Sequence, residues 1–393
     1  MKVLEGIRVL DFGRYIAGPF CAALLADYGA DVIRIDRVGG SEDRFVVPVT
    51  PRGEGALFLQ SNRNKRSLTL DIDAPQGREV VARLVRTADI VIANMPPRTL
   101  QALGLDYASL AAIRPDIILT ASTAFGDQPE VRDRTGFDGT GQAVSGAIHL
   151  TGLPGQPAKP MVPMVDIATA ISCAFGTMMA LYERRDSGLG QEVGASLLRT
   201  GLNIASGALI EEALLGLDRR ATGSRSPSYG PSDLFQARDG WFITQAIGPG
   251  MFRRWARMVG RPELADDPRM ADDALRGEHG AELSAIMSEW SAGRSRAECL
   301  AALEQARIPS SPVFSPRETL ADGLVNAAQS FSPVAYPGLE QPLPLVSPPV
   351  WMSRTPPAIA SRPPLAGEHT DAILAELGYD AQAVAGLRAI GIV

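Results

Sequence analysis

The first 125 residues alternate short β-rich runs with helical segments, and this alternation constrains the fold more than any other feature of the sequence. The strand candidates are residues 7–12, 31–36, 89–94 and 116–122. Helical spacing of apolar residues, or a proline near the first turn, marks residues 19–30, 74–88 and 100–114. Strands that are joined through helices run parallel, so we predict an α/β fold: a mostly parallel sheet with helices on both faces.

The rest of the chain predicts a second, smaller domain and a returning tail. A long helix is expected over about 164–184, and the stretch "DRRATGSRSPSYGPSD" is typical of a linker. After it, "LFQARDGWFITQAIG" predicts a hairpin turning at Asp239-Gly240, and the proline-rich residues 332–366 predict an extended segment wrapped over a surface. The expected parts are a large α/β domain over 1–217, a linker over 218–233, a small α+β domain over 234–325, and a return over 326–393 that completes the large domain.

Composition and charge exclude several classes of function. The chain has 393 residues, of which 45% are hydrophobic, enough to bury a large core. Its net charge is −6, and no basic patch suits a nucleic acid. Charged residues interrupt the amino terminus where a secretory signal needs an apolar core, and the longest uncharged run, Ile167 to Tyr182, is shorter than the ~20 residues that span a bilayer. We therefore expect a cytoplasmic protein that binds neither nucleic acid nor membrane.

No sequence motif indicates a metal or a tightly bound cofactor. Cys21, Cys173 and Cys299 are far apart and form no CxxC pair, which argues against a disulfide framework and a zinc site. The glycine-rich stretches "GGSED" and "GTGQAVSG" lack the spacing of a dinucleotide fingerprint or a phosphate loop. We expect no metal site.

One acid stands out from its surroundings. Asp166 lies in "MVPMVDIATA", at the start of the expected long helix, with no other charge until Glu183. It is either a first-turn acid, stabilised by the helix amides and dipole after Pro163, or a poorly hydrated nucleophile. The two interpretations are compatible, because the field of a helix N-terminus can keep a carboxylate ionised in a dry site.

Ordered blocks along the whole chain resemble a known family. They are "LEGIRVLDFGRYIAGPFCAALLADYGADVIRID", "NRNKRSLTLDI", "ADIVIANMPP", "GFDGTGQAVSG", "GLGQEV" and "PPLAGEHTDAILAELGY". Together they resemble the class III, formyl-CoA transferase-like (CaiB/BaiF) coenzyme A transferases. The resemblance implies a large Rossmann-like parallel-sheet domain, a smaller α+β domain, and an interlocked homodimer in which each chain passes through a hole in the other.

The resemblance also implies a mechanism. Asp166 matches the family's nucleophile, which attacks an acyl-CoA thioester and passes through mixed anhydrides and an aspartyl-CoA thioester to a second carboxylic acid. Asp138 matches a supporting carboxylate, although a turn or helix-cap acid after Gly136 is an equally good interpretation from sequence. Acyl-CoA is then a substrate rather than a bound cofactor.

The family's coenzyme A site maps onto the first sheet. The matching positions are Arg14, Tyr15, Ile16, Ala17, Arg37, Asn94 and Arg98. Guanidinium groups suit phosphates, which favours Arg37, but an ordinary solvated arginine is the alternative. Two positions depart from the family pattern: Ala102 replaces an arginine, and Ile16 replaces a glutamine of oxalate-specific members, which argues against oxalate or formate.

The acceptor pocket is expected to include two further segments. Arg132 and Arg134 in one loop predict a second carboxylate on the substrate, as in succinate or mesaconate, with solvent exposure as the alternative. In the other, "TGSRSPSYG" matches the family's glycine-rich loop without its consecutive glycines, so a gating role is in doubt. Its candidate pocket residues are Ser226, Tyr229 and Gly230.

Two other functions compete with a CoA transferase. The related α-methylacyl-CoA racemases use a histidine where this chain has Phe137, and an apolar ring cannot carry a proton. A non-catalytic CoA-binding protein would form no covalent adduct on Asp166. Both remain alternatives at the level of the sequence.

Overall fold

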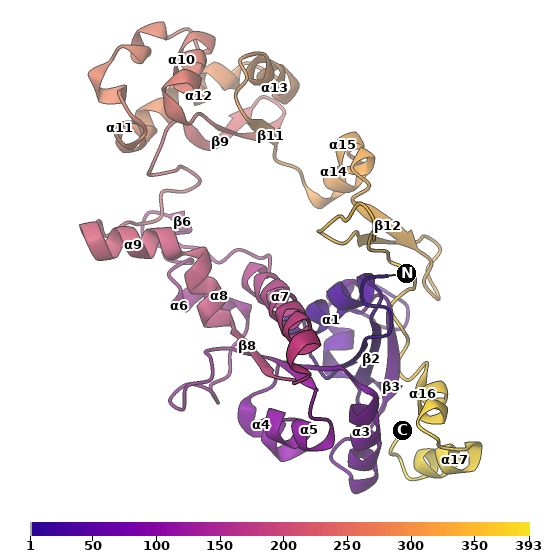
Figure 1. The fold of residues 1–393 in the computed structure, drawn as a ribbon. Coiled ribbons are helices and arrows are strands. Elements are labelled where there is room, and N and C mark those ends of the chain that lie inside the picture. The colour runs from indigo at the N-terminus through magenta and orange to yellow at the C-terminus, as the bar shows by residue number, and fades with distance from the viewer. Residues whose placement is uncertain (1) are drawn as a thin grey trace. The chain divides into compact units, whose positions relative to one another are not determined.

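A six-stranded parallel sheet forms the centre of the computed structural model, which describes residues 2–393 (Figure 1). The strand order is β3-β2-β1-β4-β5-β8, and every neighbouring pair is parallel. The strands are β1 (Arg8–Asp11), β2 (Asp31–Asp36), β3 (Lys65–Thr69), β4 (Ile90–Ala93), β5 (Ile118–Thr123) and β8 (Glu192–Ser196). The predicted α/β fold is thus confirmed, with β3 and β8 added to the strands expected from the sequence.

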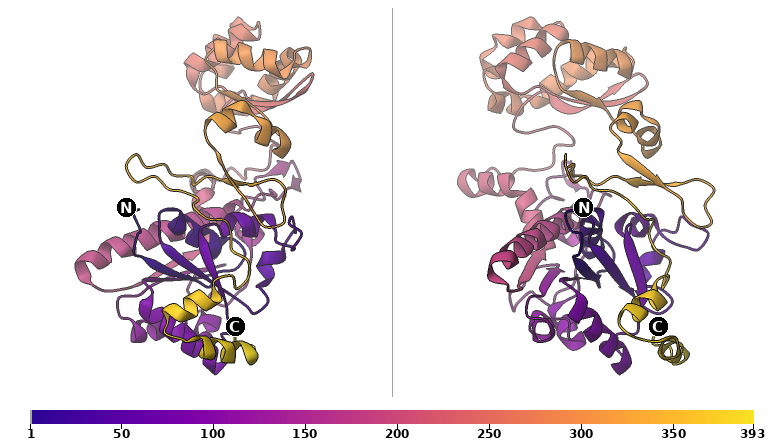
Figure 2. Two further views of the ribbon diagram at one scale, coloured as in Figure 1. Left: turned by 90° about the vertical axis from the view of Figure 1, so that its right-hand side faces the viewer. Right: turned by 45° about the vertical axis from the view of Figure 1, so that its right-hand side comes forward.

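Helices cover both faces of this sheet, because alternate strand residues point to opposite sides. Val9 and Val32 belong to the cluster that includes α1 (Ala17–Asp27) and α7 (Met164–Ser187). Leu10 and Ile33 belong to the cluster on the other face. Figures 1 and 2 show the two layers. The elements of the second layer are α3 (Pro75–Thr87), α4 (Pro97–Leu103), α5 (Tyr107–Ile113), α16 (Thr370–Glu376) and α17 (Ala381–Ala389).

Helix α7 is long and apolar enough to cross a membrane by length and composition alone. In the fold it is a core helix: Ala170, Cys173 and Leu181 pack into the cluster shared with α1. A core helix passes the same compositional test as a membrane span, so the test does not indicate a membrane protein here.

Short elements complete the part of the chain around the sheet. They are η1 (Glu42–Phe45), α2 (Ala56–Ser61), α6 (Asp138–Val144), α8 (Leu197–Ile204), β12 (Phe331–Val334) and β13 (Leu343–Val346). Helix α9 (Ser206–Leu215) follows α8 and lies mostly in the second compact unit. The proline-rich return contains the antiparallel pair β12–β13 and packs Leu343 and Leu345 against Phe58 of α2. Gln60 of α2 exchanges two hydrogen bonds with the backbone of Val346, at 2.9 and 3.0 Å. The return therefore pairs with the sheet domain through both apolar and polar contacts.

The chain divides into two compact units. The first contains residues up to 146, 161–207 and 329–393; the second contains 147–160 and 208–328. In the second, β9 (Ser232–Ala237) and β10 (Gly240–Gln245) form the predicted antiparallel hairpin, and β11 (Ser310–Pro312) adds a third strand. Its remaining elements are β6 (Gly152–Leu153), β7 (Gln156–Pro157), α10 (Gly248–Met258), η2 (Pro262–Ala265), η3 (Pro268–Met270), α11 (Asp273–Glu278), α12 (Gly280–Ala292), α13 (Arg296–Gln305), α14 (Pro316–Ala321) and α15 (Gly323–Ala327). The domain boundaries expected from the sequence stay a prediction.

Candidate active site

Asp166 lines a cavity of about 230 Å³ at the ends of the parallel strands. The residues that follow β1, β4, β5 and β8 in the chain supply much of its wall, as expected for a ligand site in an open α/β sheet. Its lining includes Arg14, Tyr15, Ile16, Ala17, Asn94, Ser122, Thr123, Arg132, Arg134, Phe137 and Leu197. The fold thus brings the sequence-predicted nucleophile together with many of the predicted pocket residues.

The carboxyl group of Asp166 is in a poorly hydrated position. It lies in the first turn of α7, half-buried, one residue after the fully buried Val165. Burial raises the pKa of Asp166 to about 7, and the nearby charge of Asp138 adds to the rise. A carboxylate with a pKa near neutrality is both more basic and less solvated than an ordinary one, which suits a nucleophile.

Asp138 connects α6 to the start of α7. Its Oδ1 atom accepts hydrogen bonds from the backbone amides of Val165 at 2.8 Å and Asp166 at 3.1 Å. Its Oδ2 atom accepts a hydrogen bond from the side chain of Gln142, one turn later in α6. Because Pro163, the N-cap residue of α7, makes no side-chain cap, Asp138 supplies from another helix the acceptor that α7 lacks.

The loop after β1 is held on both sides by polar side chains. The side-chain amide of Asn94 makes two hydrogen bonds to the backbone of Arg14, both at 2.7 Å: its Oδ1 atom accepts the Arg14 N–H, and its Nδ2 group donates to the Arg14 carbonyl. The next residue, Tyr15, has a left-handed φ of +62° and donates its backbone N–H to Asp43 Oδ2 at 3.1 Å. Arg34 in turn binds both carboxylate oxygens of Asp43 at 2.7 and 2.9 Å.

Behind this loop lies a network of buried charges that sequence reasoning missed. Lys65 Nζ donates to Asp11 Oδ2 and to the Pro19 carbonyl, both at 2.7 Å, while Asp11 Oδ1 accepts the Gly13 N–H. Burial lowers the pKa of Lys65 to about 8. The sequence did contain one indication of this network: Arg34 is a charged residue among the apolar residues inside the strand segment "DVIRID". A charge buried in a strand needs a buried partner of opposite charge.

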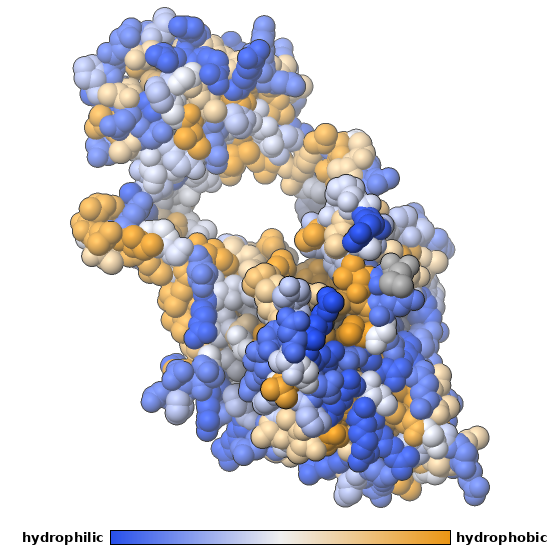
Figure 3. Space-filling model, viewed as in Figure 1, coloured by the Kyte–Doolittle hydropathy of each residue, from blue (hydrophilic) through white to orange (hydrophobic). Residues whose placement is uncertain are grey.

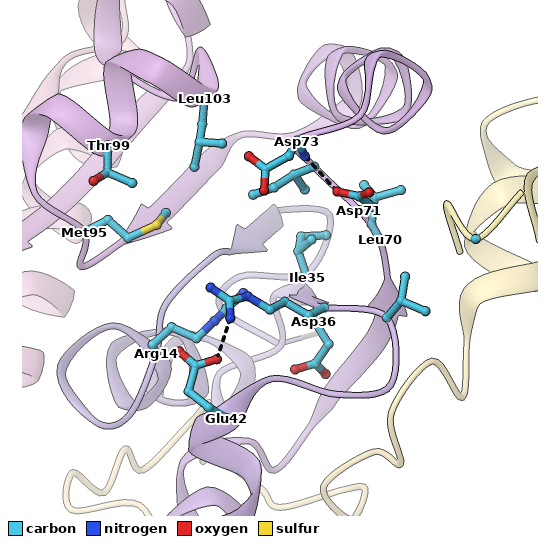
Figure 4. A pocket seen from close by; sticks show the side chains of 14 residues that line it. Arg14, Ile35, Asp36, Glu42, Leu70, Asp71, Asp73, Met95, Thr99 and Leu103 are labelled. Atoms are coloured by element: carbon cyan, nitrogen blue, oxygen red, sulfur yellow. Dashed lines mark hydrogen bonds and ion pairs between the residues drawn. The ribbon is translucent and has the colours of Figure 1, made fainter.

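A second cavity, of about 550 Å³, shares Arg14 with the first (Figure 4). Figure 4 shows Asp71 and Asp73 on one wall and Thr99 and Leu103 on another. Arg37 also lines it and approaches Glu42 at 3.5 Å with a largely exposed side chain. The two cavities share a wall residue, so together they could hold a ligand that has one large part and one small part.

The other predicted site residues lie outside these two cavities. Arg98 is exposed, and its backbone N–H donates to Asp133 at 3.3 Å. Ser226, Tyr229 and Gly230 belong to the second compact unit. Their part in an acceptor pocket therefore stays a prediction.

Comparison with known proteins decides the family. The profile of CoA-transferase family III matches residues 4–370. The chain belongs to CoA-transferase family III. This confirms the family resemblance seen in the sequence, and a family III CoA-transferase is an enzyme that uses CoA thioesters as substrates.

Curated relatives and solved structures agree with this assignment. The chain is 34% identical over 388 residues to succinate–glutarate CoA-transferase of Agrobacterium fabrum, covering 95% of each chain. It is 33% identical over 380 residues to succinyl-CoA–D-citramalate CoA-transferase of Chloroflexus aurantiacus, covering 96% of this chain and 94% of that one. The fold matches a CaiB/BaiF family protein from Brucella suis with a TM-score of 0.84 and 31% identity, covering 96% of this chain and 99% of that one. Family III relatives that act on succinyl-CoA and dicarboxylic acids thus align with essentially the whole chain.

Proposed function

We propose that this family III enzyme transfers CoA from a dicarboxylic acyl-CoA to a second dicarboxylic acid through covalent intermediates on Asp166. The observation that carries the proposal is the half-buried carboxyl of Asp166, with its pKa near 7, in a small cavity beside three arginines. The names of the relatives, which include transferases for glutarate and D-citramalate, support the class of acid.

The overall reaction exchanges one acyl-CoA and one carboxylate for another pair, so it neither takes up nor releases a proton or an electron. An Asp166 oxygen attacks the thioester carbonyl, the C–S bond breaks, and a mixed anhydride and CoA thiolate form. The thiolate attacks the aspartyl carbonyl and releases the donor acid, leaving an aspartyl-CoA thioester. The acceptor carboxylate then displaces the thiolate, which attacks the acyl carbonyl of the second anhydride and regenerates free Asp166. Each step is intramolecular or within one site, so proximity and low hydration supply much of the rate.

Asp138 and the two cavities have distinct parts in this scheme. Asp138 fixes the first turn of α7 through the Val165 and Asp166 amides, so that the nucleophile keeps one position through four attacks. The larger cavity has room for the adenosine part of CoA, with Arg14 and Arg37 as the cations in its lining, and the acyl part suits the smaller cavity that Asp166 lines. Arg14, which lines both, lies where the pantetheine arm would pass.

We propose further that the enzyme is a cytoplasmic homodimer. Apolar side chains of α9 are exposed in the single chain, and Figure 3 shows this hydrophobic surface along α9. They are Leu209, Ile210, Leu214 and Leu215. A second copy would cover them, because patches of this kind mark association surfaces. Sedimentation of the purified protein tests this point, and a monomer at micromolar concentration contradicts it.

The covalent step is tested by trapping the intermediate. The enzyme is incubated with succinyl-CoA or glutaryl-CoA, and the peptide that contains Asp166 is analysed by mass spectrometry with and without hydroxylamine. We expect a hydroxylamine-sensitive adduct on Asp166 and no transfer by Asp166→Asn. Full transfer activity in that variant would remove the proposal. Solvent deuterium appearing at the α-carbon of a branched acyl-CoA would instead favour the racemase alternative.

A further inference from the structure

Three arginines line the cavity beside Asp166, and they differ in the partners of their side chains. Arg14 Nη1 donates to the carbonyl oxygens of Phe12 at 3.1 Å and Gly13 at 2.8 Å. The side chain of Arg132 is about half exposed and approaches Asp133 at 3.8 Å. Among residues 2–393, no hydrogen bond or ion pair engages the side chain of Arg134. Its guanidinium group is therefore free in the unliganded chain.

Arg134 is exposed, the alternative that the sequence left open, and its side chain rests on an aromatic ring. Its guanidinium carbon lies 4.6 Å from the centre of the Phe125 ring. Phe125 packs against the cluster of Ala124, Val165 and Leu197, so the arginine rests on the apolar group that also holds the residue before Asp166. A guanidinium group that uses its flat face for a ring keeps its N–H edges for hydrogen bonding.

We propose that Arg134 selects dicarboxylic acids by binding the carboxylate remote from the one that reacts at Asp166. This rests on the proposed function, since it concerns the acid that Asp166 exchanges. A guanidinium fork binds a carboxylate through two parallel charged hydrogen bonds. The cavity of about 230 Å³ is small enough for a short-chain acid. A monocarboxylic acid of the same length leaves Arg134 unpaired and places a methyl group against its charge.

The donor and the acceptor use Arg134 in turn. Both acids are joined in turn to the carboxyl carbon of Asp166, the donor through an Asp166 oxygen and the acceptor through its own oxygen, so their remote ends occupy the same region of the cavity at different times. A residue that favours a second carboxylate on one acid therefore favours it on the other. The inferred specificity is for transfer from one dicarboxylic acid to another.

A competition experiment measures this selectivity directly. Wild type, Arg134→Gln, Arg134→Lys and Arg132→Gln each receive glutarate and pentanoate together, with succinyl-CoA as donor, and the two acyl-CoA products are quantified. Both acids compete for the same aspartyl-CoA intermediate, so the donor step cancels from the product ratio. Arg132→Gln is the matched control, because it removes a neighbouring arginine of the same cavity.

The outcomes separate this inference from the proposed function. We expect Arg134→Gln to lower the glutarate-to-pentanoate ratio about 10- to 100-fold, the value of a hydrogen-bonded charge, and Arg132→Gln to change it by no more than about twofold. Arg134→Lys, which keeps the charge but not the fork, should fall between them, and it carries the test if the glutamine variant does not fold. A wild-type ratio that survives in Arg134→Gln, an equal loss in Arg132→Gln, or no wild-type preference for glutarate overturns the inference while CoA transfer stands. Absence of CoA transfer to any acid by wild type overturns both.

Discussion

The negative charge of Asp138, beside the proposed nucleophile Asp166, can be removed with almost no change of shape. In Asp138→Asn, the Oδ1 atom still accepts the Val165 and Asp166 amides. The new Nδ2 group faces Gln142, whose buried Oε1 atom has no hydrogen-bond partner within residues 2–393. Rotation of the Gln142 amide lets that oxygen accept from the new asparagine. The substitution therefore isolates the charge of Asp138 from its capping role.

The two causes of the raised pKa of Asp166 limit how far the pKa can fall in Asp138→Asn. Burial and Asp138 together lift the pKa of Asp166 from 3.8 to about 7, and burial is the larger cause. The charge of Asp138 therefore accounts for at most about half of the rise in the pKa of Asp166, or ~1.6 pH units. At about 1.36 kcal/mol per pH unit, this is ~2 kcal/mol of free energy of ionisation. In Asp138→Asn we expect the pKa of Asp166 to fall by up to that amount and to remain above its ordinary value.

The pH profile of kcat/KM for the acyl-CoA donor measures this pKa in the free enzyme. In the proposed mechanism Asp166 attacks only when ionised, so the wild-type value should fall about tenfold per pH unit below a midpoint near 7. The midpoint of Asp138→Asn should move to lower pH, and that of Asp133→Asn, an exposed acid in the neighbouring loop, should not move. An unchanged or higher midpoint in Asp138→Asn refutes the electrostatic reasoning.

Three further predictions concern stability and packing. Because the folded state resists ionisation of Asp166, Asp166→Asn should be more stable than wild type above pH ~7, by up to about 4 kcal/mol in denaturant unfolding, with the gain vanishing near pH ~4. Asp43→Asn leaves buried Arg34 without its bidentate partner and should cost about 3–5 kcal/mol, measured the same way; a loss below about 1 kcal/mol contradicts this. A Cβ on Gly141 would lie 2.9 Å from Val165 Cγ1, so Gly141→Ala should cost about 1–3 kcal/mol and slow adduct formation, whereas Gly386→Ala, with open space around it, should change neither.

The strands that the sequence predicted are those in which Val, Ile, Leu and Ala predominate or alternate with few polar residues. β1, β2, β4 and β5 are buried almost throughout, and their Val, Ile and Leu content marks them. β3 begins with Lys65 and Arg66, which pattern rules place in solvent, yet the Lys65 side chain is fully buried against Asp11. β8 is short, contains a glycine and lies at the sheet edge, so it has little apolar signal.

The candidate site was predictable to the extent that its chemistry lies in local sequence. Asp166 could be found because it is the one charged residue in the ten-residue stretch "MVPMVDIATA", at the start of an apolar helix. The pairing of Phe125 with Arg134 and of Arg34 with Asp43 depends on how loops fold back, which no periodicity records. Sequence thus predicted the candidate nucleophile, and the structure was needed for the residues that hold its surroundings in place.

The buried charges behind the first loop have a consequence for catalysis as well as for stability. A left-handed tyrosine costs of order 1–2 kcal/mol, so Tyr15 keeps φ +62° only because its surroundings require it. Asp43, fixed by Arg34, accepts the Tyr15 amide, and the Tyr15 ring meets Phe137 edge-on at 5.6 Å. Phe137 directly precedes Asp138 at the start of α6. We therefore expect Asp43→Asn to disturb the contact between the Tyr15 and Phe137 rings and, through Phe137, the neighbouring cap residue of α7. The rate of adduct formation on Asp166 should fall in this variant, and an unchanged rate in single-turnover measurements contradicts the reasoning.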